Sequence, residues 1–455
     1  MTNIILILYL IILSVIAIGS FRKVKSYSDF FVARKKGSYW AVTGSLTATI
    51  LGGSAVIGAI DAGKSMGWAT SWFMLSAALG LLALLPFTKR VSRLGRFTLP
   101  DLLEDLYGKS AKTISSVIIP VAWLGIVAAQ LIAAARILQS FTGLGYNTGV
   151  ILSGIVFIAY TIAGGQLSVL KTDLIQAILI VGGLIILSIF SIEKISFNDI
   201  RTYPLSWPFN YNFKPIDLFI LIISYSSTFT AGPDIYSRIF CSLNEKTAKR
   251  AVLTTSMILI PVAVMIGLIS VAGALVPGVD HNGSALIELS QIALPVWSIP
   301  IIVLGLLSAV LSSADTTLLS ASIITTDLVL KGKFNEYTLK TTRIIILFAG
   351  ILAIIIASNF TSIIGMLLLA LTVYSGAFII PIIIGLANVK VRSNFVSAAV
   401  LTGGIVALIG KILTYTQWIK LSDWVIIGAF VLNATILLAG IPKNKKKPPV
   451  NTDGI

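Results

Sequence analysis

The residues TATILGGSAV, at positions 47–56, indicate how this chain folds. They lie in the middle of an apolar stretch, about residues 39–61, and about 20 mostly apolar residues are enough for a helix to cross a bilayer. Two adjacent glycines, Gly52 and Gly53, interrupt the stretch near its centre. Transporters unwind helices at such points, because the freed backbone carbonyls can bind a cation or a solute in mid-membrane. The alternative is close packing of helices through small residues.

The stretch SSTFTAGPD, at positions 226–234, predicts a second broken helix. Pro233 lacks a backbone donor and disfavours helix at the residue before it. The two interrupted stretches begin five predicted spans apart. Broken helices at corresponding places in two five-span halves are typical of inverted-repeat transporters, which bind solute and ion where the repeats meet.

The composition places this chain in a lipid bilayer. Of its 455 residues, 56% are hydrophobic and only 11% are charged, against roughly 25% charged in soluble proteins, and the mean hydropathy is +0.96. Soluble enzymes, secreted disulfide scaffolds and disordered chains are therefore excluded. The single cysteine, Cys241, and the single histidine, His281, provide no ligand set for zinc, haem or an iron–sulfur cluster. We expect neither an enzyme nor an organic cofactor.

Hydropathy predicts thirteen transmembrane helices joined by short polar loops. They span about 3–20, 39–61, 67–87, 113–138, 147–164, 173–192, 216–240, 251–276, 294–330, 343–358, 361–388, 394–415 and 422–441. With the N-terminus outside, 27 of the 34 Lys and Arg residues fall on the inner side and six on the outer. This bias predicts a multi-pass protein of the plasma membrane with a cytoplasmic C-terminus. It also accounts for the net charge of +16 without a nucleic-acid partner.

The residues SAVLSSADTT, which begin at Ser308 in the ninth predicted span, indicate a cation site. Four residues follow the spacing of one helical face: Ala309, Ser312, Ser313 and Thr316. Hydroxyl and carbonyl oxygens suit a small hard cation, and the remaining ligands would be carbonyls of the first broken helix, at Ala48 and Leu51. Asp315 strengthens this interpretation, since acids inside a membrane are usually functional. The alternative is that the hydroxyls only bond back to their own helix.

Three motifs follow one another along the chain. They are Gly164-Gly165-x-x-x-Val169-x-x-Thr172-Asp173-x-x-Gln176, Pro233-Asp234-x-Tyr236-x-Arg238 and Ala309-x-x-Ser312-Ser313. In this order and spacing they resemble the sodium/solute symporter family, which includes sodium-coupled glucose, proline, pantothenate and sialic acid transporters. The resemblance covers roughly residues 3–441 and implies an all-α fold of two inverted five-helix repeats, with one leading and two trailing helices. Thirteen spans agree with that arrangement.

The same resemblance implies a division of the chain. We expect a leading helix and basic loop at 1–38, a first repeat at 39–192, an extracellular loop at 193–215, a second repeat at 216–388, two trailing helices at 389–441 and a basic cytoplasmic tail at 442–455.

The resemblance also implies ligands for sodium. The conserved sodium site would consist of Ala48, Leu51, Ala309, Ser312 and Ser313. A second cation, found in some members, would use Asp173, Ser312, Asp315 and Thr316. Asp315 replaces a hydroxyl there, so a proton site or a structural pair are the alternatives. Asp173 also fits a helix cap together with Thr172.

The solute site is predicted from residues near the two breaks. Candidate wall residues are Ser54, Gln130, Tyr225, Phe229, Tyr374 and Phe378. They offer few polar groups, so an amino acid, an organic acid or a vitamin-like carboxylate fits better than a sugar, whose many hydroxyls need partners. The alternative for the aromatic residues is a lipid-facing or core-packing role, which is the more frequent one for an aromatic in a membrane helix. No acid stands among these wall residues, which argues against quaternary amines.

Two charged residues follow the second break. Asp234 and Arg238 would form an inner-gate ion pair, or Asp234 would contact the solute. Together these features predict a sodium-coupled symporter that imports a small organic solute by alternating access. The alternatives are a proton-coupled symporter on the same fold, with Asp173 or Asp315 as carrier, and a transport-derived sensor.

Overall fold

The structure is a computed structural model that describes residues 18–94, 97–279, 284–415 and 419–442, with Tyr9, Ile11, Ile12, Val15 and Ile16 before them. Most of the predicted leading helix, His281 and nearly all of the predicted basic tail lie outside these residues.

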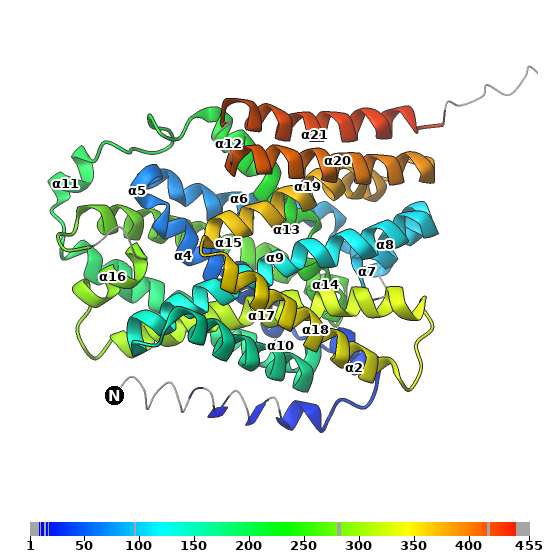
Figure 1. Ribbon diagram of the computed structural model, residues 1–455, viewed down its shortest axis with the longest axis horizontal. Coiled ribbons are helices and arrows are strands. Elements are labelled where there is room, and N and C mark those ends of the chain that lie inside the picture. Colours follow the sequence, from blue (N-terminus) through cyan, green and yellow to red (C-terminus); the bar gives the residue numbers. More distant parts are fainter. Residues whose placement is uncertain are drawn as a thin grey trace, which may run out of the picture.

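Helices make up nearly all of the described chain (Figure 1). They are α2 (Tyr27–Val32), η1 (Ala33–Lys35), α3 (Tyr39–Ile50), α4 (Gly53–Asp61), α5 (Gly63–Met66), η2 (Gly67–Thr70), α6 (Ser71–Leu84), η3 (Leu85–Phe87), α7 (Thr88–Leu94), α8 (Leu99–Tyr107), α9 (Lys109–Thr142), α10 (Tyr146–Ile192), α11 (Phe197–Thr202), α12 (Pro215–Leu221), η4 (Ile222–Ser226), α13 (Ser227–Ala231), α14 (Pro233–Cys241), α15 (Glu245–Leu275), α16 (Ala285–Ala293), α17 (Ile299–Leu330), α18 (Thr338–Asn359), α19 (Ile363–Leu386), α20 (Ser393–Tyr415) and α21 (Ile419–Ala439).

These lengths confirm a polytopic membrane protein. Within the described residues, nine helices are long and apolar enough to cross a membrane, and the bent pair of α3 and α4 would make a tenth. The exact count of thirteen spans is not confirmed. Its leading span falls mostly outside the described residues, and two predicted spans, 147–164 and 173–192, lie in the single element α10.

Both predicted helix breaks are present. α3 ends at Ile50 and α4 begins at Gly53, with the two helix axes bent by 42°. The second break lies at Gly232, whose extended backbone separates α13 from α14. A π-helical turn, η4, precedes this second break and is not foreseen by hydropathy. At both breaks the helical hydrogen-bond ladder stops in the middle of an apolar stretch.

α10 differs from the expectation of two spans joined by a loop. The chain stays helical on both sides of Gly165, which alone leaves helical geometry with φ 52° and ψ −154°. A kink therefore replaces the predicted loop, because one glycine can absorb the whole change of direction. Asp173 consequently lies inside a helix. The interpretation of Thr172 and Asp173 as a helix cap is wrong.

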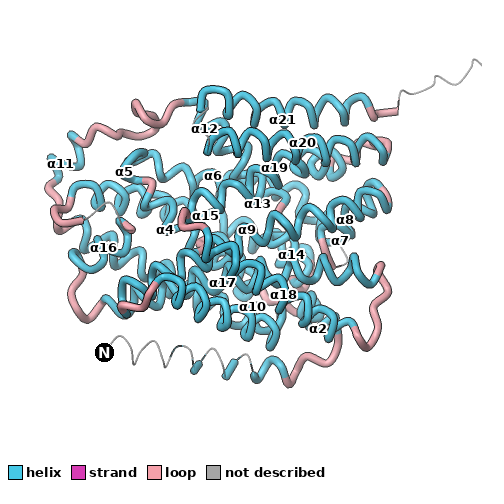
Figure 2. The backbone as a smooth tube through the Cα atoms, viewed as in Figure 1, coloured by secondary structure: helices cyan, strands magenta, loops and turns pink. Residues whose placement is uncertain are grey.

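The helices form one bundle with its connections at two opposite ends (Figures 1 and 2). α5, α11 and α16 lie at one end, whereas α2, α7 and α8 lie at the other. Most connecting loops gather at these two ends. This separation matches the predicted alternation of inner and outer loops along the chain.

α17 is the central helix of the bundle. It packs against α10, α9 and α3, and 83% of its most apolar window is buried, against 28% for α18 and 39% for α20. α20 and α21 pack against each other at one edge (Figure 1). Of these helices, α17 is thus the most enclosed by protein, and it carries serines and an aspartate at its middle, where polar groups can find partners.

Candidate functional site

The predicted cation ligands of α3 and α17 meet in the structure. The Ser312 hydroxyl donates to the carbonyl of Ala48 at 3.0 Å, and the Ser313 hydroxyl donates to the carbonyl of Thr49 at 2.9 Å. Both carbonyls belong to the last turn of α3, where the break removes their usual helical donors. Hydroxyls of one helix thus face freed carbonyls of another, and these are the oxygen ligands that a small hard cation prefers.

The remaining ligands of this set lie close by. Ser312 also donates to the carbonyl of Ala309 at 3.2 Å, so that oxygen points to the same place. Leu51 follows α3 with non-helical φ −80° and ψ 40°, which frees its carbonyl from the ladder. The donor set fits a monovalent cation, because all five groups are neutral oxygens on two helices. Sodium as the ion bound here stays a prediction.

Two glycines let α4 approach α17 at this point. A Cβ on Gly53 would lie 2.1 Å from Cγ2 of Val310, and one on Gly52 would lie 2.3 Å from the Ser313 hydroxyl oxygen. Any larger side chain would push the broken helix away from the serines. The Gly-Gly pair is therefore required for close contact as well as for the break.

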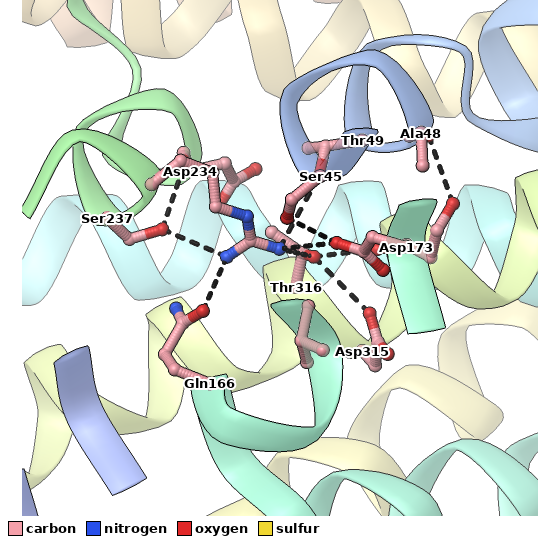
Figure 3. Close-up of polar contacts among 12 residues, drawn as sticks. Ser45, Ala48, Thr49, Gln166, Asp173, Asp234, Ser237, Asp315 and Thr316 are labelled. Atoms are coloured by element: carbon pink, nitrogen blue, oxygen red, sulfur yellow. Dashed lines mark hydrogen bonds and ion pairs between the residues drawn. The ribbon is translucent and has the colours of Figure 1, made fainter. Parts of the chain in front are cut away.

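A buried arginine organises the neighbouring cluster (Figure 3). Arg238 comes from α14, is fully buried, and its guanidinium donates to groups on α3, α10, α14 and α17. Its partners are Gln166 at 2.8 Å, Ser237 at 3.2 Å, Thr49 at 3.4 Å, Asp173 at 3.5 Å and, closer still, Thr316. Four helices that are distant in sequence are thus joined through one cation.

The sequence-predicted second cation site contains this guanidinium. Asp173 accepts a hydrogen bond from Ser45 and forms an ion pair with Arg238 at 3.5 Å. Asp315 accepts from Thr316 at 3.3 Å. One oxygen of Asp173 and one of Asp315 are buried without a hydrogen-bond partner in the described chain. Arg238 therefore supplies a fixed positive charge where a second cation was expected, and that second cation stays untested.

Arg238 pairs with Asp173 and not with Asp234. The inner-gate pair expected from sequence is absent from the ion pairs of the described residues. Asp234 instead accepts a hydrogen bond from the indole nitrogen of Trp123 on α9, at 2.7 Å. Asp234 and Arg238 do not pair, although they lie one turn apart on α14, because the Arg238 side chain points towards its partners on α10 and α17.

A cavity of about 60 Å³ lies between the two helix breaks. Each buried water needs about 10–15 Å³ of such space, so the cavity holds only a few water molecules in this conformation. Four of the six predicted solute residues line it: Ser54, Gln130, Tyr225 and Phe229. Asp234 also lines it. A solute larger than a few atoms would need the cavity to widen.

Gln130 holds the start of α4. Its carbonyl oxygen accepts from the Ser54 backbone at 3.1 Å, and its amide nitrogen donates to the Ser54 hydroxyl at 2.8 Å. The side chain thus caps the second half of the broken helix from α9. A solute that contacts Gln130 would also act on the position of α4.

Tyr374 and Phe378 lie behind the cavity and do not line it. Tyr374 donates to the carbonyl of Ala231 at 2.5 Å, next to the second break, and its ring packs edge-on against Trp123. Phe378 packs against Tyr374 at 5.2 Å between centroids. Both support the wall from α19, and a direct role in solute binding stays a prediction.

Sequence reasoning missed Trp123. It lines the cavity and contacts Asp234, yet its only signal in the sequence is a tryptophan in mid-span, which is equally common in packing. Thr228 and Thr317 line the cavity as well and were not singled out.

Comparison with known proteins identifies the relatives of this chain. The sequence model of the Sodium:solute symporter family matches residues 30–406. The sodium/proline symporter of Salmonella typhimurium is 24% identical over 438 residues, which cover 88% of this chain and 86% of that protein. The sodium/glucose cotransporter 4 of Homo sapiens is 28% identical over 199 residues, covering 42% and 28%.

Solved transporters share the fold. The structure of a Na⁺-coupled sialic acid symporter, in a substrate-bound outward-open state, aligns with a TM-score of 0.78 and 17% identity over 96% of each chain. MHP1, a nucleobase-cation-symport-1 family transporter, aligns with a TM-score of 0.60 and 13% identity over 91% of this chain and 93% of that one.

These findings agree with the geometry of the two broken helices. The family match spans most of the chain, and its relatives are transporters. The expected inverted-repeat transporter fold is therefore confirmed, while the boundaries of the two repeats stay a prediction. The chain belongs to the sodium:solute symporter family and is an integral, multi-pass membrane transporter, not an enzyme.

Proposed function

We propose that this protein imports a small organic solute by sodium-coupled symport across the plasma membrane, with its N-terminus outside and its C-terminus in the cytoplasm. Sodium would bind to Ala48, Leu51, Ala309, Ser312 and Ser313, and the solute would occupy the cavity between the breaks. The single observation that carries this proposal is the contact of the Ser312 and Ser313 hydroxyls with the freed carbonyls of α3.

Coupling would arise because the two sites share the broken helix. The sodium ligands include the end of α3, and the cavity is lined by the start of α4, at Gly52 and Ser54. An ion that orders this break favours one conformation, and a solute that prefers the same conformation then binds more tightly. Inward movement of sodium along the membrane potential would provide about 2.3 kcal/mol per charge per 100 mV.

The first test is a sodium titration that needs no solute. Purified protein is titrated with NaCl at constant ionic strength against KCl, and tryptophan fluorescence is followed. We expect a saturable, sodium-specific change in the wild type that is lost in the Ser312→Ala/Ser313→Ala variant. Ser322→Ala is the matched control, because Ser322 is equally buried on α17 but its hydroxyl bonds only to Leu318 of its own helix.

The outcome decides between two coupling ions. A wild type without a sodium response, or a response that survives the double substitution, would refute the proposed site. Proton coupling is the second candidate, and the buried, unpartnered oxygens of Asp173 and Asp315 favour it. Uptake into proteoliposomes under a sodium gradient or a proton gradient would separate the two.

A further inference from the structure

The charge of the central cavity is negative. Its lining residues come from both breaks and from α9, α17 and α19, and Asp234 is the only one among them with a formal charge. Neither lysine nor arginine lines it. Asp234 is 9% exposed, whereas Asp173, Asp315 and Arg238 are 0% exposed. Of the buried charges around the breaks, Asp234 is thus the one that a solute in the cavity can reach.

The structure holds this carboxylate in place at the start of a helix. Asp234 is the second residue of α14, at the positive end of the helix dipole, which stabilises a negative charge. Trp123 donates to one of its oxygens at 2.7 Å. Arg238, one turn further along, directs its guanidinium to Asp173, Gln166 and Thr316 instead. Within the described residues, Asp234 therefore has no ion-pair partner, and a cation bound beside this buried carboxylate would supply one.

The rest of the cavity suits a cation better than an anion. Trp123, Tyr225 and Phe229 line it, and aromatic ring faces attract ammonium groups. Tyr225 and Phe229 lie with ring centroids 5.1 Å apart. The free N–H groups at the start of α4 would suit a carboxylate. Gln130, however, already accepts the hydrogen bond from the Ser54 backbone N–H there.

We propose that the solute carries a positively charged amino group that pairs with Asp234 and lies against Trp123 and Phe229. This inference rests on the proposed function and narrows it. An amine or an amino acid has a cationic group that can pair with Asp234, whereas an organic acid or a vitamin-like carboxylate without an amino group finds no basic partner. The expectation against quaternary amines came from a wall set that lacked Asp234, and the second break brings this acid into the wall.

The test uses three compounds with one shared isobutyl body: isobutylamine, isobutanol and isovalerate, which are cationic, neutral and anionic at pH 7. Each is titrated into purified protein in NaCl and in KCl, and binding is followed by the fluorescence of tryptophan, including Trp123. We expect a dissociation constant for isobutylamine at least tenfold lower than for the other two compounds in NaCl.

Variants test whether Asp234 causes the preference for the amine. Asp234→Asn should weaken isobutylamine binding at least tenfold and remove its advantage over isobutanol, while Asp234→Glu should keep the advantage. Asp327→Asn is the matched control, since Asp327 is also a buried acid but pairs with Lys112 at 2.9 Å and does not line the cavity. It should leave the preference unchanged.

Three results would overturn the inference: tighter binding of isovalerate, equal or undetectable binding of all three compounds, or an amine preference that persists in Asp234→Asn. The same samples are titrated with sodium alone. A retained sodium response with a preference for isovalerate would reject only the amine, whereas loss of the sodium response would reject the proposed function itself.

Discussion

Removal of the Arg238 guanidinium should be among the most destabilising single changes in this protein. Arg238→Met keeps most of the side-chain volume but leaves Asp173 fully buried without its cation. Breaking a buried ion pair in this way costs about 3–5 kcal/mol. The lost hydrogen bonds to Gln166, Ser237 and Thr316 act in the same direction.

The matched control is another arginine–aspartate pair of the same chain. Arg34 bonds to Asp29, but the Arg34 side chain is 51% exposed, and the buried Asp29 carboxylate also accepts from the backbone N–H groups of Lys25 and Ser26. Arg34→Met should therefore cost less than Arg238→Met, because water can replace the exposed guanidinium while the backbone donors still hold the carboxylate. Both variants are measured by denaturant titration in detergent micelles, with tryptophan fluorescence as the signal.

A double-mutant cycle tests whether the destabilisation comes from breaking the pair of Arg238 and Asp173. Asp173→Asn alone leaves the guanidinium without its partner, so it should also destabilise. The double variant Arg238→Met/Asp173→Asn removes both charges, and we expect it to be about 2–3 kcal/mol more stable than the sum of the single effects predicts. Additive effects, or equal costs for Arg238→Met and Arg34→Met, would refute the view that this buried pair joins the four helices.

Three further variants test separate features. Gly165→Ala should cost about 1–3 kcal/mol, because φ is positive there and the new Cβ would lie 2.8 Å from the Phe30 carbonyl oxygen; an unchanged denaturation midpoint would contradict a strained kink. Tyr374→Phe should cost about 1–2 kcal/mol in the same titration, since the Ala231 carbonyl at the second break loses its donor while the ring packing remains. Lys112→Met should lower the thermal unfolding midpoint in detergent, because Lys112 lies 2.8–3.0 Å from two acids on α8 and one on α17; an unshifted midpoint would show that these contacts contribute little.

The local chemistry of the sequence was sufficient for the overall architecture. Apolar stretches of membrane-spanning length predicted the bilayer. A Gly-Gly pair and a Gly-Pro step each interrupt a helix within a few residues, so they predicted both helix breaks. The serine pair on α17 was predicted for the same reason, because helical spacing places neighbouring hydroxyls on one face. Gly165 was misread, since hydropathy cannot distinguish a loop from a kink inside one helix.

The partners of the charged residues were decided only by the tertiary structure. Arg238 and Asp173 are 65 residues apart, and Trp123 and Asp234 are 111 apart. Nothing in the spacing of Asp234 and Arg238 on one helix shows that their side chains point to different neighbours. The sequence by itself determined a membrane transporter with two broken helices, because apolar length, glycine and proline act locally. The packing of α9, α10 and α17 decided which acid faces the cavity and which is paired with arginine, because those contacts exist only once the helices have met.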